Sequence, residues 1–322
     1  MLCAAILTDK PVQFTNMPVT LQDIQPLSAV LEELGVKTAL NTDGVAVLHA
    51  REITSTKAPY ELVRKMRASV LVLGPLLARC GHAEVSLPGG CAIGTRPVDL
   101  HISGLEKMGA QITLEGGYIK AEAPNGLKGA HITFPKVSVG ATENLMMAAA
   151  LADGETILSN AAREPEITYL GECLIGMGAK IEGLGTDTIK ITGVKKLKGT
   201  VHDVVADRIE TGTWMIAACL TGGKLRLQGA RIEHLDALMG PLFEAGLEVE
   251  QDGDDIICSR SNQPLSGTDI MTEPYPGFPT DLQAQFMTML TLCMGAGMVT
   301  ETIFENRFMH VPELCRMGAD IR

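Results

Sequence analysis

A single cysteine stands in a glycine-rich segment, SLPGGCAIGTRPVD, at residues 86–99. Flanking glycines give the backbone around Cys91 wide conformational freedom and remove shielding side chains, so the pattern predicts an exposed loop. A thiol in such a loop reacts in proportion to its thiolate fraction, which a nearby cation raises, and Arg96 follows five residues later. The segment therefore indicates a reactive Cys91. A small apolar side chain tucked under a hairpin is the alternative.

The end of the same segment reads Arg96-Pro97-Val98-Asp99 and leads into the helix-forming run DLHISGLEKMG. Proline restricts the turn. Arg96 and Asp99 then present a forked donor and an acceptor on one short element, a pair suited to a polar ligand such as a base with a phosphate. The alternative is a local ion pair in which Asp99 serves as the N-cap of the helix. From these residues alone, both interpretations stay open.

Residues 135–144, PKVSVGATEN, lead into the apolar helix LMMAAALA. Lys136, Ser138 and the backbone of Val139 and Gly140 would surround the start of this helix, where free backbone N–H groups attract phosphate. An ordinary serine N-cap needs no ligand and is the alternative. The segment therefore predicts either a phosphate site or a simple helix start.

Three further polar residues stand beside apolar helices. Arg67, in RKMRASVLVLG, begins one of them, and an exposed basic face is the alternative to ligand binding. Asp281, in FPTDLQAQF, follows a proline turn and predicts either an N-cap or a catalytic carboxylate. Arg307 lies among aromatic residues in FENRFMHVPEL and stays ambiguous by itself. The seven histidines show no HxxH or HExxH spacing, so we expect no metal site. We also expect no cofactor.

An internal repeat must position these residues. A helical run that ends in glycine, followed by a short alternating strand, recurs five times, as LEELGVKTA, LEKMGAQIT, LIGMGAKIE, LFEAGLEVE and LCRMGADIR. Glycine is the residue expected where a helix ends with a positive φ. The spacings between successive marker glycines are 74, 69, 68 and 72 residues. These glycines are Gly35, Gly109, Gly178, Gly246 and Gly318.

A second helix interleaves with the first and also stops at a glycine step before a strand, in LLARCGHAEVSL, AALADGETILSN, ACLTGGKLRLQG and CMGAGMVTETIF. Leu-x-Gly steps precede a further strand in three of the copies. One unit therefore reads helix–strand–helix–strand–strand over about 70 residues, a small α/β subdomain rather than a short solenoid repeat. The first copy begins with a helix and the last stops at Arg322 as its strand begins, so we expect a chain cut at both ends.

Composition limits the class of protein. The chain has 322 residues, of which 46% are hydrophobic and only 4% aromatic, so one large or two ordinary domains must have an aliphatic core. A formal net charge of −11 argues against wrapping nucleic acid or binding an anionic membrane. The eight cysteines form no CxxC pair, and no apolar run has the length of a signal peptide or a membrane span. We therefore expect a cytoplasmic protein.

The motifs LPGGCAIGTRPVDLHISGLEKMGA, KVSVGATEN, AAREPEI, DRIETGT, FPTDLQAQF and ENRFMHVPEL, in this order, resemble the UDP-N-acetylglucosamine 1-carboxyvinyltransferase family along the whole chain. The sister family, the 5-enolpyruvylshikimate-3-phosphate synthases, shares the repeated fold but lacks the cysteine loop and the RPVD element. The resemblance implies an α/β (α+β) fold, a two-domain inside-out α/β barrel of repeated βαβαββ units with helices inside. Residues 1–206 would form a three-unit domain carrying the cysteine loop. Residues 207–322 would form a second, incomplete domain that lacks its N-terminal strand and final unit.

The resemblance also implies transfer of the enolpyruvyl group of phosphoenolpyruvate to the 3′-hydroxyl of UDP-N-acetylglucosamine, with release of phosphate. That reaction is the first committed step of peptidoglycan synthesis and the target of fosfomycin. Cys91 would be the general acid at C3 of phosphoenolpyruvate, and Asp281 would accept or orient the hydroxyl proton. The implied substrate contacts are Arg67, Arg96, Pro97, Val98, Asp99, Leu100, Lys136, Val137, Ser138, Val139, Gly140, Asp281, Ile303 and Arg307.

In the family, a Lys-Asn pair before the first apolar helix and arginines from the last unit also contact phosphoenolpyruvate, and this sequence contains neither group. A truncated, catalytically impaired nucleotide-sugar-binding fragment or paralogue is therefore the alternative function. The resemblance implies a monomer whose partners are these two small-molecule substrates, with no nucleic acid and no membrane.

Overall fold

The computed structural model describes residues 1–64, 66–87, 93 and 97–322 of the chain. The described residues form two compact units, called unit 1 (1–64, 66–87 and 97–205) and unit 2 (Ile93 and 206–322) below. Each unit has its own cluster of buried apolar side chains, and aliphatic residues dominate both clusters. Within the described ranges, no helix combines the length and the apolar character needed to cross a membrane.

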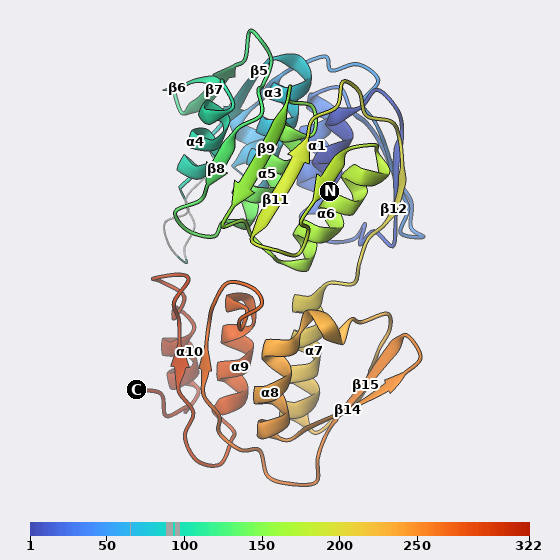
Figure 1. Cartoon of the computed structure of the whole chain (residues 1–322). Helices are drawn as coiled ribbons and strands as arrows, with labels where there is room; N and C mark the ends of the chain where they lie inside the picture. Colours follow the sequence, from blue (N-terminus) through green and yellow to red (C-terminus); the bar gives the residue numbers. More distant parts are fainter. Residues whose placement is uncertain (65, 88–92, 94–96) are drawn as a thin grey trace. The chain divides into compact units, whose positions relative to one another are not determined.

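The described part of unit 1 contains three four-stranded sheets that share one strand order. In each sheet a short strand pairs in parallel with a second strand, and an antiparallel hairpin completes the sheet. The strands, in spatial order, are β12 (Val201–Asp203), β1 (Val12–Thr15), β3 (Ala46–His49) and β2 (Lys37–Leu40); β4 (Lys57–Ala58), β5 (His82–Ser86), β7 (Tyr118–Glu122) and β6 (Gln111–Glu115); and β8 (His131–Thr133), β9 (Glu155–Ser159), β11 (Thr188–Thr192) and β10 (Lys180–Glu182). Figure 1 shows the last of these sheets through β8, β9 and β11.

The helices of unit 1 make up its interior. They are η1 (Leu2–Leu7), α1 (Ile24–Glu33), α2 (Tyr60–Val63), η2 (Arg67–Val72), α3 (Leu73–Cys80), α4 (Asp99–Lys107), α5 (Val139–Ala149) and α6 (Pro165–Gly176), of which η1 and η2 are 3₁₀ helices. All six residues of η1 and eight of the 11 in α5 are buried. A helix that is apolar on nearly every side is an interior helix, whereas strands such as β9 and β11 alternate between buried and accessible residues. The expected arrangement, helices inside and sheets outside, is confirmed.

The repeat is also confirmed, because every marker glycine ends a helix with a left-handed backbone. Left-handed φ angles disfavour any residue with a Cβ, so glycine recurs at these stops. The φ values are 96° at Gly35, 93° at Gly109, 102° at Gly178, 112° at Gly246 and 103° at Gly318. The interleaved stops at Gly81, Gly154, Gly222 and Gly295 have φ of 75°, 104°, 74° and 86°.

The first repeat in the sequence has no strand before its first helix, and β12 supplies that strand from the far end of unit 1. It pairs in parallel with β1, with Gln13 opposite Val201 and Thr15 opposite Asp203. The Gln13 N–H donates to the Thr200 carbonyl at 2.9 Å, and the Thr15 hydroxyl donates to the Asp203 carboxylate. Each of the three sheets in unit 1 therefore has its parallel strand.

Unit 2 follows the same plan. Its sheet has the order β13 (Lys224–Leu227), β15 (Asp255–Arg260) and β14 (Leu247–Asp252), and β16 (Ile270–Met271) pairs in parallel with β17 (Val299–Thr300). Its helices are α7 (Arg208–Thr221), η3 (Ile232–His234), α8 (Asp236–Ala245), η4 (Thr280–Leu282), α9 (Gln283–Leu290) and α10 (Val311–Arg316). Helices α7, α8 and α9 run side by side in Figure 1. The rings of Phe278 and Phe286 meet edge to face in the core, with centroids 5.4 Å apart.

Two interior helices of unit 1, α3 and α5, meet closely at Gly74. A Cβ added to Gly74 would lie 2.4 Å from the side-chain oxygen of Asn144 and 2.5 Å from its backbone oxygen. The Gly74 N–H donates to that side-chain oxygen at 2.7 Å. Glycine at this position therefore allows the two helices to approach and form the hydrogen bond.

We expect Gly74→Ala to lower the free energy of unfolding by about 1–3 kcal/mol, because the added methyl group forces α3 and α5 apart. Gly240→Ala is the control, since nothing lies within 4 Å of a Cβ at this exposed position in α8. Alanine in an open helix position should stabilise by up to about 1 kcal/mol. Urea unfolding followed by circular dichroism measures both, and an unchanged Gly74→Ala protein would contradict the close contact.

Candidate active site

The start of α5 carries the predicted segment Lys136–Gly140. Ser138 is the N-cap, and its hydroxyl accepts a hydrogen bond from the Ala141 N–H at 3.3 Å. Lys136 is exposed one turn before the helix, and Val139 is 37% exposed at its first position. The serine N-cap considered as an alternative is thus present. It leaves a lysine and the first free N–H groups of the helix at an accessible end, which suits an anion.

The start of α4 carries the second predicted segment, Pro97–Leu100. The helix begins at Asp99, and the residue at the cap position is Val98, so the alternative prediction that Asp99 is the N-cap is wrong. Val98 and Leu100 are buried, whereas Pro97 and Asp99 are exposed. The alternation anchors the segment through its apolar side chains and leaves the polar carboxylate accessible. Asp99 also lies in the first turn, where a negative charge stabilises a helix.

A buried hydrogen bond joins these two helix starts. The Asn144 side chain in α5 donates to Nδ1 of His101 in α4 at 2.9 Å and to the Val70 carbonyl at 3.3 Å. Since Nδ1 of His101 accepts, the ring proton of the neutral histidine is on Nε2. The Cε1–Nε2 edge faces Gly140, where an added Cβ would lie 3.4 Å from Cε1.

The electrostatic environment of His101 includes Arg67, the third predicted residue of unit 1. Burial is the largest cause that lowers the pKa of His101 to about 4, the positive charge of Arg67 adds to it, and Asp99 opposes it. Arg67 begins η2 and is half-buried. The structure therefore brings together Arg67, the Pro97–Leu100 segment and the Lys136–Gly140 segment around one neutral, buried histidine.

The predicted residues of unit 2 form a second cluster. The Arg307 guanidinium donates from Nη2 to Oδ1 of Asp281 at 2.8 Å, and it lies 5.5 Å from the centre of the Phe304 ring. The Arg307 side chain is 17% exposed and that of Asp281 55% exposed, so the pair is anchored from the arginine side. Asp281 lies in η4 and makes no cap interaction with α9, whose cap residue is Leu282. The N-cap alternative for Asp281 is therefore wrong.

Ile303 is half-buried in the segment between β17 and Arg307. Its backbone N–H donates to the Glu301 carboxylate at 2.8 Å. Cys91 and Arg96, the remaining predicted residues, lie outside the described residues.

Sequence reasoning missed three residues that organise these clusters, namely His101, Asn144 and Glu301. His101 and Asn144 both lie inside motifs noted above, within DLHISGLEKMG and PKVSVGATEN. A lone polar residue on an apolar helix does not identify its partner in the sequence. His101 and Asn144 are 43 residues apart in the sequence, and the hydrogen bond between them in the structure identifies them as a pair.

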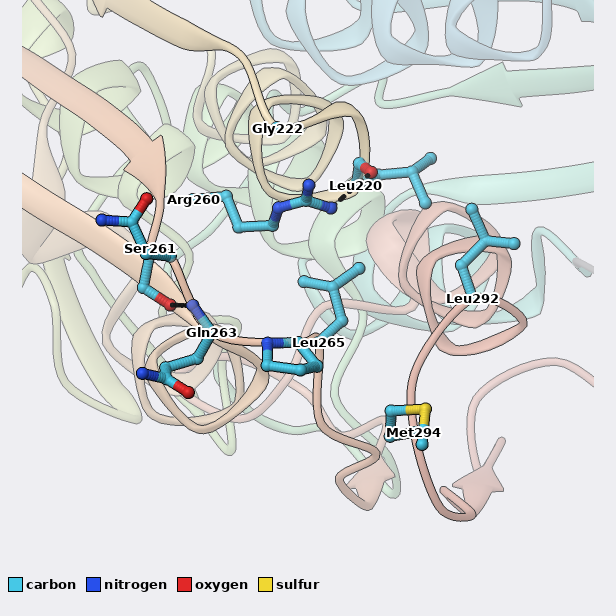
Figure 2. A pocket seen from close by; sticks show the side chains of 10 residues that line it. Leu220, Gly222, Arg260, Ser261, Gln263, Leu265, Leu292 and Met294 are labelled. Carbon is cyan, nitrogen blue, oxygen red and sulfur yellow. Dashed lines mark hydrogen bonds between the residues drawn. The ribbon is translucent and has the colours of Figure 1, made fainter.

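One open pocket of unit 2 lies apart from the predicted residues, since none of them lines it (Figure 2). Arg260 crosses it and donates from Nη1 to the Leu220 carbonyl at 3.5 Å, at the end of α7. Across the loop below, the Gln263 N–H donates to the Ser261 hydroxyl at 3.3 Å. Arg260 therefore serves the free carbonyl end of a helix, as basic side chains do. Among the described residues, no group of three or more His, Cys, Asp or Glu could hold a metal ion.

The sequence profile of one family, EPSP synthase (3-phosphoshikimate 1-carboxyvinyltransferase), matches residues 1–322. The chain belongs to the EPSP synthase family. Solved structures of the fold include the enolpyruvyl transferase NikO from Streptomyces tendae, with a TM-score of 0.86 at 21% identity over 98% of this chain and 75% of that one. EPSP synthase from Acinetobacter baumannii has a TM-score of 0.70 at 19% identity, covering 98% and 76%. At these identities the likeness establishes the fold alone.

Curated relatives within the EPSP synthase family are much more similar in sequence. The UDP-N-acetylglucosamine 1-carboxyvinyltransferase of Granulibacter bethesdensis is 59% identical over 321 residues, which cover 99% of this chain and 76% of the relative. The enzymes of that name from Rhodospirillum centenum and Caulobacter vibrioides are 58% and 56% identical, over 100% of this chain and 76% and 75% of theirs. The chain thus spans about three quarters of the length of these relatives.

The lowered pKa of His101 predicts a pH dependence of stability. The folded state keeps His101 neutral, so its contribution is fully present above the ordinary pKa of 6.5 and is lost as the pH falls toward 4. Glu143, on α5, acts in the opposite direction. Burial raises the pKa of its carboxyl to about 7. The positive charge of the N-terminal amino group lowers this pKa, whereas the negative charges of Glu166 and Glu164 raise it further. Stability from Glu143 is therefore lost as the pH rises from 4.5 toward 7.

Comparing the protein with His101→Asn isolates the histidine, because Glu143 titrates in both and asparagine retains an acceptor near Nδ1. We expect the difference in free energy of unfolding, parent minus variant, to rise by up to about 3 kcal/mol between pH 4 and 6.5 and to be constant above. Urea unfolding at stepped pH measures it. A difference that is flat across this range would show that His101 takes up its proton at the same pH in the folded and unfolded states.

Proposed function

We propose that this member of the EPSP synthase family is an enzyme that transfers the enolpyruvyl group of phosphoenolpyruvate to the 3′-hydroxyl of UDP-N-acetylglucosamine. The observation that carries the proposal is the 56–59% identity, over nearly the whole chain, to relatives named UDP-N-acetylglucosamine 1-carboxyvinyltransferase. Both substrates are anions. A helix start with a lysine in unit 1 and an arginine–aspartate pair in unit 2 suit their recognition and the handling of a proton.

The reaction is an addition followed by an elimination. The sugar oxygen forms a bond to C2 of phosphoenolpyruvate while C3 takes up a proton, giving a tetrahedral ketal. C3 then loses a proton, the bond between C2 and the phosphate oxygen breaks, and the double bond returns. The base of the site accepts the proton of the sugar hydroxyl, and that proton is passed on to the departing phosphate. The atoms and charges of substrates and products therefore balance.

In unit 1, we assign the nucleotide to the two helix starts. Lys136 and the residues from Val137 to Gly140 would receive the diphosphate, because this helix start has free N–H groups and an adjacent cation. Arg96 and the segment Pro97–Leu100 would contact the uridine end. Arg67 would bind the phosphate of phosphoenolpyruvate and stabilise the charge that develops as it leaves.

In unit 2, we assign Asp281 as the group that accepts or orients the proton of the 3′-hydroxyl. The hydrogen bond from Arg307 fixes one carboxylate oxygen of Asp281, and the rest of the side chain is accessible. Ile303 would contact the sugar. A carboxylate with one oxygen held by a guanidinium leaves the other oxygen to meet a hydroxyl.

Cys91 is assigned as the general acid that protonates C3, and as a residue that can hold phosphoenolpyruvate covalently. A loop that closes over bound sugar would bring the thiol to the alkene and exclude water. Its flanking glycines allow the backbone to do so. The same thiol would be the site at which the epoxide fosfomycin reacts.

We include a biological setting in the proposal. The product would enter peptidoglycan synthesis, and through the cell wall the enzyme would affect cell shape and division. We propose the cytoplasm as its location, which the eight cysteines without CxxC spacing support. We also propose that residues 1–206 form the three-repeat domain that carries the cysteine loop, that residues 207–322 form part of the second domain, and that the protein acts as a monomer.

The test is to incubate the protein with both substrates and to measure phosphate release, with mass spectrometry of the nucleotide product. We expect Asp281→Asn and Cys91→Ser each to lower kcat by at least about 100-fold, the usual contribution of a general acid or base. Asp252→Asn is the matched control. Asp252 is also an accessible aspartate paired with an arginine of unit 2, Arg226, and its loss should change kcat less than about twofold.

Two results would count against the proposal in different ways. In the first, calorimetry detects binding of UDP-N-acetylglucosamine, but the mixture of both substrates releases no phosphate. This result would assign the chain to nucleotide-sugar binding without turnover. Absence of both binding and turnover, together with a Cys91 thiol that fosfomycin leaves free, would overturn the enzyme assignment altogether.

A further inference from the structure

A single carboxylate in unit 2, that of Glu301, receives hydrogen bonds from three separate stretches of chain. Oε1 accepts from the Thr272 hydroxyl at 2.9 Å, from the Ile303 N–H at 2.8 Å and from the Phe304 N–H at 3.1 Å. Oε2 accepts from the Thr280 hydroxyl at 2.9 Å. Glu301 directly follows β17 and is half-buried. Four donors on one carboxylate make an unusually complete attachment for a side chain outside the core.

The partner on the β16 side is itself fixed. Thr272 is fully buried, and its N–H donates to the Thr300 carbonyl at 2.9 Å. Its hydroxyl proton goes to Glu301, so its oxygen is free to accept the Thr302 N–H at 2.9 Å. Glu301 is therefore held against the paired strands β16 and β17 on one side.

The partners on the other side belong to the candidate site. Thr280 immediately precedes Asp281, and Ile303 is the residue assigned to the sugar. Arg307, four residues beyond Ile303, closes a ring through its hydrogen bond to Asp281 at 2.8 Å. Glu301 is thus an anchor shared by the segment that carries Asp281 and the segment that carries Ile303 and Arg307.

We propose that Glu301 is a positioning residue that sets the distance and orientation between Asp281 and Ile303 for the acceptor hydroxyl of the nucleotide sugar. The proposal rests on the proposed function, in which these two residues meet the sugar. We assign Glu301 no proton transfer; its role is to hold the two segments through the three donors at Oε1 and the one at Oε2. Its effect reaches the reaction through the geometry of Asp281, and misplacement by about 1 Å can cost on the order of 100-fold in rate.

Thr280→Val provides the most selective test, since valine has the shape of threonine and removes only the bond to Oε2. We expect kcat to fall about 10-fold and KM for UDP-N-acetylglucosamine to rise, with KM for phosphoenolpyruvate unchanged. Thr280→Ser, which restores the hydroxyl, should return kcat to within about twofold of the parent. Thr288→Val is the matched control, because the Thr288 hydroxyl donates to the Ala284 carbonyl of its own helix, α9.

Glu301 itself is tested with a conservative and a severe variant. In Glu301→Gln the amide oxygen can take the place of Oε1 and the NH₂ group can donate to the Thr280 oxygen, so kcat should stay within about threefold. Glu301→Ala removes every bond, and we expect a loss of about 100-fold in kcat. A thermal melt of each variant identifies any that fails to fold, and Thr280→Val then decides the question.

The outcomes separate this proposal from the proposed function. If the parent releases phosphate and Thr280→Val matches Thr288→Val in kcat and both KM values, Glu301 has no positioning role. If the parent releases no phosphate, the proposed function fails, and calorimetric affinity for UDP-N-acetylglucosamine decides instead. Weaker binding by Thr280→Val than by Thr288→Val then supports the positioning role, and equal binding overturns it.

Discussion

The side-chain amide of Asn144 is fully buried in unit 1 and uses all of its hydrogen-bonding groups on the main elements of that unit. Its oxygen accepts from Gly74 in α3, and its nitrogen donates to the Val70 carbonyl in η2 and to His101 in α4. A buried amide left without partners would cost about 1–3 kcal/mol per group, so the positions of these elements are strongly coupled. The helix starts that carry Pro97–Leu100 and Lys136–Gly140 depend on this coupling.

In unit 2, a carboxylate rather than an amide couples the positions of the segments that carry the candidate residues. Its candidate residues lie on short segments, η4 and the stretch after β17, that have little regular structure of their own. The Glu301 oxygens collect the hydroxyl and N–H donors of these segments, and the Asp281–Arg307 ion pair joins their far ends. In both units, therefore, apolar packing builds the scaffold and a few polar side chains fix where its ends meet.

The repeated scaffold explains why polar side chains are needed near the starts of its interior helices. Helices end at left-handed glycines, and the strands that follow lie on the outside, so the starts of interior helices remain the accessible polar ends. Such ends offer free N–H groups, but the backbone alone does not form a pocket that distinguishes one ligand from another. Specificity has to come from side chains that adjacent repeats bring together, as they do His101 and Asn144 in unit 1.

The sequence by itself determined the repeat and most of the residues in the two clusters, and its resemblance to a known family implied that the helices are interior. Glycine at a helix end and alternation in a strand are local properties, which is why five marker glycines were sufficient to predict the unit. The motifs around Asp281 and Ser138 are likewise local, because the residues that suggested a carboxylate or a helix start are neighbours in the sequence. The sequence could not separate an N-cap from a ligand residue, and the structure showed that Ser138 is a cap whereas Asp99 and Asp281 are not.

Only the tertiary structure decided which distant residues are partners. The strand β12 completes the first sheet from the other end of unit 1, the Asn144 amide finds His101 across 43 residues, and Glu301 finds Thr272 and Thr280 across 29 and 21. These pairings follow from the packing of whole repeats against one another. No local propensity encodes them, because a hydrogen bond between distant residues depends on where the backbone places them and not on the residues between.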